Sequence, residues 1–300
     1  MGERKPYPSD LSDEEWALIE PFIAAWKARH PSVSGHRGAY AMREIVNAIR
    51  YQSKTGCQWR YMPHDLPPHT AVEYYFYRWR DDGTDQAVHD LLRCQVRERA
   101  GRAEDPTAVN MDTQSVQAAA TVPAGTTGTD AGKKRRGRKR GIASDVLGLV
   151  IAVVVTAASV HDNPIGTALL DKVALDAPAV RTVWTDAGFK NTVTGHGTAL
   201  GIDVRVVRRD PQVRGFVPLP KRWIAEQVFG TLMWHRRLVR DYERDPASAE
   251  SRIYWAMTTN MTRRLTRTAT ATWRAPAPPT RAPSSPQGPP AAAQAPTRAA

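Results

Sequence analysis

Three acidic side chains stand where a protein can hold divalent metal ions. Asp112 and Asp186 each end an apolar segment that predicts a strand, and Glu226 lies in a predicted helix. Carboxylate oxygens are the hard ligands that Mg²⁺ prefers, and two ions about 3.5–4 Å apart can activate a nucleophile and neutralise phosphate charge. These residues therefore predict a site for two Mg²⁺ ions, with Mn²⁺ as an alternative, that acts on a phosphodiester.

Each of these acids also has an ordinary structural interpretation. Asp112 could cap the segment that follows it, and Asp186 precedes an Ala-Gly pair, which is typical of turns. Glu226 could form an ion pair along its helix with Arg222. Position alone does not decide, because four other acids also lie at the ends of predicted elements: Asp145, Asp162, Asp203 and Asp210.

The composition indicates a polyanionic partner. The 300 residues carry a net charge of +12, with an isoelectric point near 10.0, and 41% of them are hydrophobic, enough to form a core. The longest apolar run, 147–160, is too short to cross a bilayer, so we expect no membrane partner. Two cysteines cannot form a disulfide framework, and the N-terminus has no apolar signal segment, which predicts a cytoplasmic protein.

The first 100 residues predict a helical domain. Ser12 and Glu15 form a capping box before one helix, and Thr70 and Glu73 form a second box before a helix rich in aromatic residues and arginines. Helices around a Gly-containing turn resemble a helix-turn-helix DNA reader, and the alternative is a plain helical bundle whose aromatic residues form the core. The side chains expected to contact DNA are Arg60, Thr70, Tyr74, Arg78 and Arg80.

A strongly basic run follows at 133–140, where seven of eight residues are Lys or Arg. We predict a loop between strands, whose packed like charges take DNA phosphates as counter-ions. The alternatives are a solvated loop without a partner and a nuclear-import signal. The predicted phosphate contacts are Lys133, Lys134, Arg135, Arg136, Arg138, Lys139 and Arg140.

Beyond residue 100 the pattern alternates strands and helices. The predicted strands are 107–114, 142–145, 147–158, 180–185 and 203–207, and the last predicted helices are 222–242 and 253–265. An antiparallel start followed by parallel crossovers matches an RNase H-like α/β fold with a mixed five-stranded sheet. We therefore predict a helix-turn-helix-like domain at 1–100, a catalytic domain at 105–267, and a disordered, Pro- and Ala-rich tail at 268–300.

Short motifs, found in order over most of residues 8–265, are similar to those of one known family. They are D-L-S-D-E-E-W at 10–16, T-G-C-Q-W-R at 55–60, D-T-Q-S-V at 112–116, G-R-K-R at 137–140, T-D-A-G-F at 185–189, K-R-W-I-A-E at 221–226, R-R-L at 236–238 and D-Y-E at 241–243. On these motifs the chain resembles the DDE transposases of the insertion-sequence family five, enzymes of bacterial mobile elements.

The resemblance implies that Asp112, Asp186 and Glu226 are the catalytic, metal-binding acids. It implies cleavage at the ends of the element, followed by direct attack of the freed 3′ hydroxyls on target DNA. The implied partners are double-stranded DNA, as terminal inverted repeats and as target, and further copies of the chain in a homodimer or higher oligomer in the nucleoid. Three further arginines would hold backbone phosphates: Arg222, Arg236 and Arg237.

Two positions depart from the family's helix signature. The usual tyrosine is replaced by Leu219, and the usual basic residue after the glutamate is replaced by Met233. These departures motivate an alternative function, a catalytically decayed transposase that binds specific DNA as a repressor. A nuclease of the same fold, which hydrolyses strands without joining them, is a third hypothesis.

Overall fold

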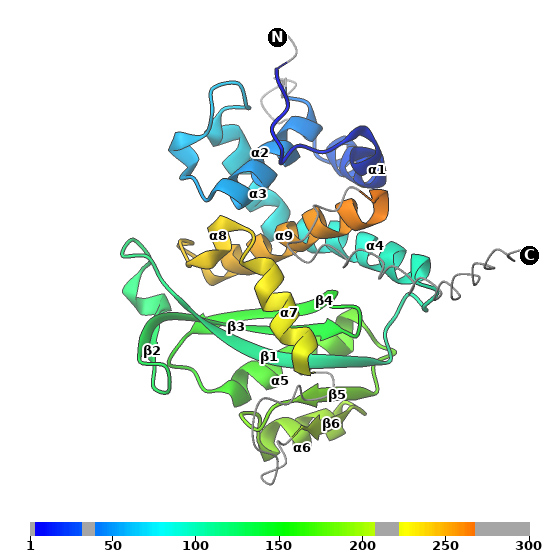
Figure 1. The fold of residues 1–300 in the computed structure, drawn as a ribbon, viewed down its shortest axis with the longest axis vertical. Helices are drawn as coiled ribbons and strands as arrows, with labels where there is room; N and C mark the ends of the chain where they lie inside the picture. Colours follow the sequence, from blue (N-terminus) through cyan, green and yellow to red (C-terminus); the bar gives the residue numbers. More distant parts are fainter. Residues whose placement is uncertain (1–3, 32–39, 208–221, 268–300) are drawn as a thin grey trace, which may run out of the picture. The chain divides into compact units, whose positions relative to one another are not determined.

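The structure is a computed structural model, and it describes residues 4–31, 40–207 and 222–267 (Figure 1). Helices fill the first part of the chain: α1 (Asp13–Arg29), α2 (Met42–Thr55), η1 (Trp59–Tyr61), α3 (His69–Asp81) and α4 (Thr84–Arg99). The sheet region comprises β1 (Ala108–Gln117), η2 (Ala124–Thr126), β2 (Gly128–Asp130), β3 (Arg135–Asp145), β4 (Val150–Ala157), α5 (Asp162–Asp176), β5 (Thr182–Thr185), α6 (Asn191–Ala199) and β6 (Asp203–Val206). The last described helices are α7 (Arg222–Leu232), α8 (Arg236–Val239) and α9 (Pro246–Thr266).

The strands form one mixed sheet, which has six strands in the described part of the chain. Its order is β2-β3-β1-β5-β6, and β4 also pairs with β3. β3 runs antiparallel to β1 and β4, whereas β5 runs parallel to β1 and β6. The prediction of five strands is wrong by one, because the short polar strand β2 has no alternation of apolar residues to reveal it.

The basic run is not a loop. Residues 135–140 form the first half of β3, which pairs with β1 on one side and with β2 and then β4 on the other. Gly137 lies where β3 closely approaches β1, since a Cβ there would come within 1.9 Å of the Val116 carbonyl oxygen. Strand pairing with remote segments, rather than local propensity, therefore decides this conformation.

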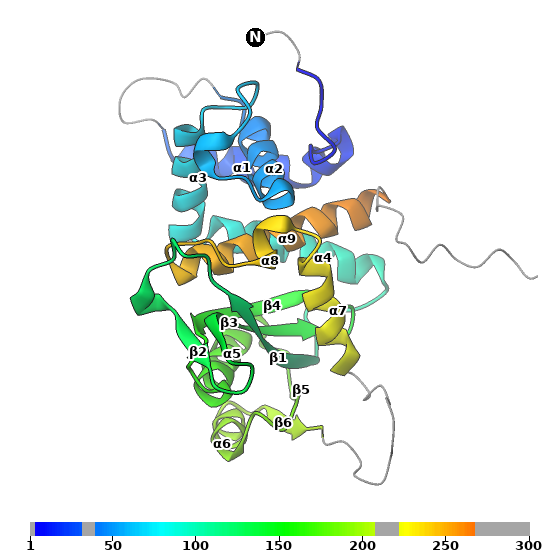
Figure 2. The ribbon, with the colours of Figure 1, turned by 60° about the vertical axis from the view of Figure 1, so that its left-hand side comes forward.

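Both faces of β4 are buried, as its apolar, β-branched sequence predicts. Val153 and Val155 pack into one hydrophobic cluster together with residues of α9, and Ile151 and Val154 pack into a second cluster that includes residues of α5. Figure 2 shows α5 on one side of the sheet and α9 on the other. The sheet is consequently held between two helical layers.

The N-terminal helices share a core with α9. Ile19 of α1, Ile49 of α2 and Trp79 of α3 belong to the same hydrophobic cluster as Trp255 of α9. The rings of Trp79 and Trp255 lie 5.5 Å apart, centroid to centroid. The boundary expected near residues 101–104 therefore divides segments of the chain that are packed together.

The helix ends follow the sequence in part. The Ser12 hydroxyl accepts a hydrogen bond from the Glu15 N–H at 3.1 Å, as predicted. The box predicted at Thr70 is wrong, since α3 begins at His69 and no side chain caps it. One helix was predicted over 222–242, but α7 ends at Leu232 and α8 follows after a turn.

A tertiary contact accounts for the break between α7 and α8. His235, in the turn, is buried, and its ring hydrogen-bonds to the Ser53 hydroxyl of α2 at 2.8 Å. Helical periodicity cannot report such a partner. The predicted disordered tail at 268–300 and the departure at Leu219 lie outside the described residues.

Candidate active site

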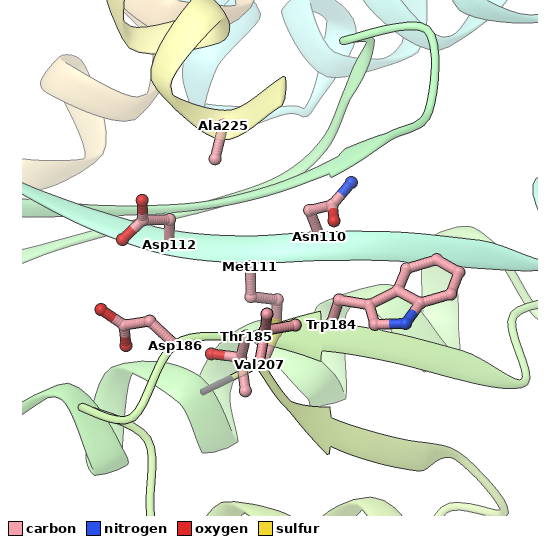
Figure 3. A pocket seen from close by; sticks show the side chains of 8 residues that line it. All are labelled: Asn110, Met111, Asp112, Trp184, Thr185, Asp186, Val207 and Ala225. Carbon is pink, nitrogen blue, oxygen red and sulfur yellow. The ribbon is translucent and has the colours of Figure 1, made fainter. Parts of the chain in front are cut away.

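Asp112 and Asp186 belong to two neighbouring parallel strands. Asp186 directly follows β5, as predicted, but the prediction that Asp112 ends its strand is wrong, because β1 continues to Gln117 through its pairing with β3. β1 pairs with β5 so that Asn110 stands opposite Trp184, and continuing this register by two residues sets Asp112 beside Asp186. Both aspartates line one small cavity together with Ala225 of α7. Figure 3 shows Asp112 on β1 and Asp186 in the turn that follows β5.

Backbone N–H groups orient the two carboxylates. The Oδ1 atom of Asp112 accepts from the Thr113 N–H at 2.7 Å, and the Oδ1 atom of Asp186 accepts from the Gly188 N–H at 2.9 Å. A Cβ at Gly188 would lie 3.0 Å from Asp186 Oδ1 and 2.9 Å from the Oδ2 atom of Asp162. The turn therefore orients Asp186, and Gly188 places no side chain against these oxygens. Asp186 can thus both form the turn and serve as a metal ligand.

Glu226 lies on the helix that borders the cavity. It is exposed, and its neighbour Ala225 lines the cavity with the two aspartates. Across the described residues, no three His, Cys, Asp or Glu side chains come close enough together to hold a metal ion. The structure thus brings two predicted acids together and places the third on the adjoining helix.

Asp162 is an acid near the site to which sequence reasoning gave no role. Its Oδ1 atom accepts from the Thr113 hydroxyl at 3.0 Å and from the Lys139 ammonium at 3.1 Å. Its Oδ2 atom lies close to Gly188, next to the turn that holds Asp186. No spacing in the sequence indicates this proximity, since the contact joins β1, β3 and α5.

The basic run divides into an exposed and a buried half. Residues 133–136 are exposed, whereas Arg138 and Arg140 are almost fully buried. Arg138 donates to Asp241 at 3.2 Å and to the Glu243 carbonyl at 2.8 Å, and Arg140 donates to the Leu238 carbonyl at 2.7 Å. Burial also lowers the pKa of Arg140.

The predicted phosphate contacts of the buried half need correction. The groups that Arg138 and Arg140 bind are protein oxygens, and Lys139 binds Asp162 together with the Val160 carbonyl at 2.8 Å. A buried cation that is already hydrogen-bonded cannot reach a DNA backbone without leaving these partners. Only residues 133–136 are presented at the surface as predicted.

The N-terminal side chains expected to contact DNA are mostly exposed. Thr70, Tyr74 and Arg78 lie exposed along one face of α3. Arg60, in the preceding short helix η1, is also exposed. Arg80 instead lies largely covered, with its guanidinium 5.0 Å from the centre of the Tyr77 ring and paired to neighbouring aspartates. Three other aromatic residues of α3 are core residues, as the bundle interpretation requires: Tyr75, Phe76 and Trp79.

The arginines after the cavity also differ from one another. Arg236 is exposed, but Arg237 is buried and pairs with Glu243 at 2.7 Å. Met233, at the departure from the family signature, packs against the hydrophobic core. Arg222 begins α7, and its side chain is outside the described atoms.

The chain matches two known protein families. The mixed sheet, with Asp112 on β1 and Asp186 after β5, agrees with the RNase H-like fold that the family comparison implies. A family model described as "Transposase DDE domain" matches residues 103–261, and one described as "Putative transposase of IS4/5 family" matches residues 11–89. The first match covers more than half of the chain, which therefore belongs to the DDE transposase family.

This membership confirms the resemblance found in the motifs and supports transposase function. No curated protein matches the chain. Among the helices that the structure describes, none combines the length and the apolar character needed to cross a membrane.

Proposed function

We propose that this transposase cleaves DNA at the ends of its mobile element and joins the freed ends to target DNA. Asp112, Asp186 and Glu226 would hold two Mg²⁺ ions, with Mn²⁺ as an alternative. The observation that carries the proposal is that Asp112 of β1 and Asp186, directly after the parallel strand β5, line one cavity within a transposase DDE domain. Hard oxygen donors of this kind fit these ions.

The side chains would hold the reacting groups in place. Asp112 and Asp186 present carboxylates that nearby backbone N–H groups already orient, and Glu226 approaches from α7. Bound metal ions would neutralise phosphate charge and activate the attacking oxygen. Water would attack the phosphorus at the element end, breaking the bond to the 3′ oxygen. The released 3′ hydroxyl would then attack a target phosphodiester, forming one P–O bond as another breaks.

The exposed cations would hold the DNA backbone. They are residues 133–136 on the rim of the sheet, Arg60 and Arg78 among the N-terminal helices, and Arg236 after α7. Thr70 and Tyr74 share the exposed face of α3 with Arg78 and would contact the inverted repeats. Two element ends must be brought together, so a homodimer or higher oligomer would assemble on the DNA.

Cleavage and strand-transfer assays on DNA that carries the element's ends test this function. Asp112→Asn, Asp186→Asn and Glu226→Gln should each lower the rate by at least about 100-fold while DNA binding persists. Asp203→Asn is the matched control, because Asp203 is exposed at the start of β6 and pairs with Arg205. Its rate should equal that of the wild type.

Three outcomes would contradict the proposal in different ways. Specific DNA binding by the wild type without any metal-dependent cleavage would identify a repressor. Cleavage without joining would identify a nuclease. Equal rates for wild type and Asp112→Asn would remove the carboxylate site from the reaction.

A further inference from the structure

A buried amide lies next to the two aspartates. Asn110 precedes Asp112 by two residues on β1, so both side chains point to the same face of the sheet, as Figure 3 shows. Asn110 is only 2% exposed. Neither its Oδ1 nor its Nδ2 atom has a hydrogen-bond partner within the described structure.

A buried amide without a partner costs free energy of folding, unless some other group forms hydrogen bonds with it. Buried polar groups in native proteins almost always have a partner, and an ordered water or a ligand supplies it when no protein group does. The hydroxyl of Thr185 is in the same condition, with 4% exposure and no partner among the described residues. Both residues line the cavity that Asp112 and Asp186 share, although Thr185 is level with Met111 and so points to the opposite face of the sheet from Asn110.

The size of the cavity limits what it can hold. Its volume is about 10 Å³, close to the minimum that one water molecule needs, and far too small for a base or a sugar. A buried water also needs two to four polar partners. The Asn110 amide and the neighbouring carboxylates supply them, whereas the other walls include Met111 and Val207, which are apolar.

We infer that Asn110 is a positioning residue, whose amide holds one ordered water that hydrogen-bonds to the Asp112 and Asp186 carboxylates and fixes their orientation. An amide suits this role because it can both donate to the water and accept from it, whereas a carboxylate can only accept. Outer partners of this kind orient metal-binding carboxylates, and their loss lowers metal affinity. The inference rests on the proposed metal-dependent function.

Mn²⁺ binding and thermal unfolding of the full-length protein test this role together. Asn110→Leu keeps the shape of the side chain and removes its hydrogen bonds. The dissociation constant for Mn²⁺, measured by calorimetry or electron paramagnetic resonance, should rise about 10- to 100-fold. The melting temperature should stay the same or rise, because the variant has no buried amide to satisfy. A purely structural Asn110 would give the reverse: a lower melting temperature and unchanged Mn²⁺ affinity.

Two further variants keep the test decisive. Asn110→Ala also removes the amide, and it should lose Mn²⁺ affinity even if leucine does not fit. Thr258→Val is the matched control, since Thr258 of α9 is 2% exposed and its hydroxyl also lacks a partner in the described part of the chain. Its Mn²⁺ affinity should not change.

The outcomes separate this inference from the proposed function. Wild-type affinity for Mn²⁺ in both Asn110 variants would overturn the role of Asn110 alone. A wild type that neither binds Mn²⁺ nor cleaves DNA would overturn the metal-dependent function and the inference with it.

Discussion

The two halves of one basic run have opposite environments. Residues 133–136 are exposed, whereas Arg138, Lys139 and Arg140 are at most 9% exposed. Only Gly137 separates them. Seven cations that look equivalent in sequence therefore divide into a surface that can attract a polyanion and a set of internal cations that hold the fold together.

The difference lies in partners that are remote in sequence. Arg138 binds Asp241 and the carbonyls of Glu243 and Arg244, all of which follow α8. Glu243 in turn accepts from Arg237 and Arg252. The buried half of β3 thus belongs to an ionic network that ties the sheet to the segment between α8 and α9.

The largest effect is expected in the buried half. Arg138→Met leaves Asp241, which is 1% exposed, without its cation, and this should lower the free energy of unfolding by about 3–5 kcal/mol. Denaturant unfolding measures the loss. Arg136→Met, in the exposed half of the same strand, should change stability by less than about 0.5 kcal/mol. Similar losses in both variants would remove the distinction.

A smaller effect, on binding alone, is expected from the exposed half. Each phosphate contact contributes about 0.9 to the slope of log affinity against log salt. A variant with alanine at all four exposed positions should therefore bind DNA more weakly, with a slope reduced by up to about 3.6. Its melting temperature should match that of the wild type. The replaced residues are Lys133, Lys134, Arg135 and Arg136.

Lowering the pH should weaken the buried ionic network around Glu243. Burial alone would raise the pKa of Glu243, but the charges and hydrogen bonds of Arg252 and Arg237 outweigh it and lower the pKa below 4.5. Stability from this group is present above pH 4.5 and is lost as the pH falls through the lowered pKa. The free energy of unfolding should therefore fall as the pH is lowered from 6 to 3. In Glu243→Gln it should fall less steeply. Parallel curves would contradict this.

Lys139 should show an intermediate loss of stability. Its side chain is 11% exposed, but its partner Asp162 is 28% exposed, so water shares in solvating the pair. We expect Lys139→Met to lower the free energy of unfolding by about 1 kcal/mol, between the values for Arg138 and Arg136. Denaturant midpoints of the three variants rank them directly. A loss as large as that of Arg138→Met would place Lys139 fully inside the network.

Some of this arrangement follows from the sequence, because its signals are local. The apolar run of β4 predicts a strand buried on both faces, and the spacing of strands and helices predicts the sheet in which Asp112 and Asp186 become neighbours. Asp186 follows its strand as the sequence predicts, whereas Asp112 lies in the middle of β1, which pairing with β3 extends to Gln117.

The rest depends on contacts that no local pattern carries. The strand conformation of 135–140 depends on pairing with β1 and β4, and the break after α7 accompanies the contact of His235 with Ser53. The isolation of the Asn110 amide is a property of the folded cavity. Charge counting in particular gives no means of separating a cation that faces water from one that faces a buried carbonyl.

The shared core of the N-terminal helices and α9 has a consequence for synthesis. Trp79 leaves the ribosome long before Trp255, against which it packs, so the early helices wait with apolar surface uncovered until residue 266 has emerged. A message truncated before α9 would yield a fragment that chaperones retain and proteases remove. The cell should therefore accumulate little free N-terminal fragment.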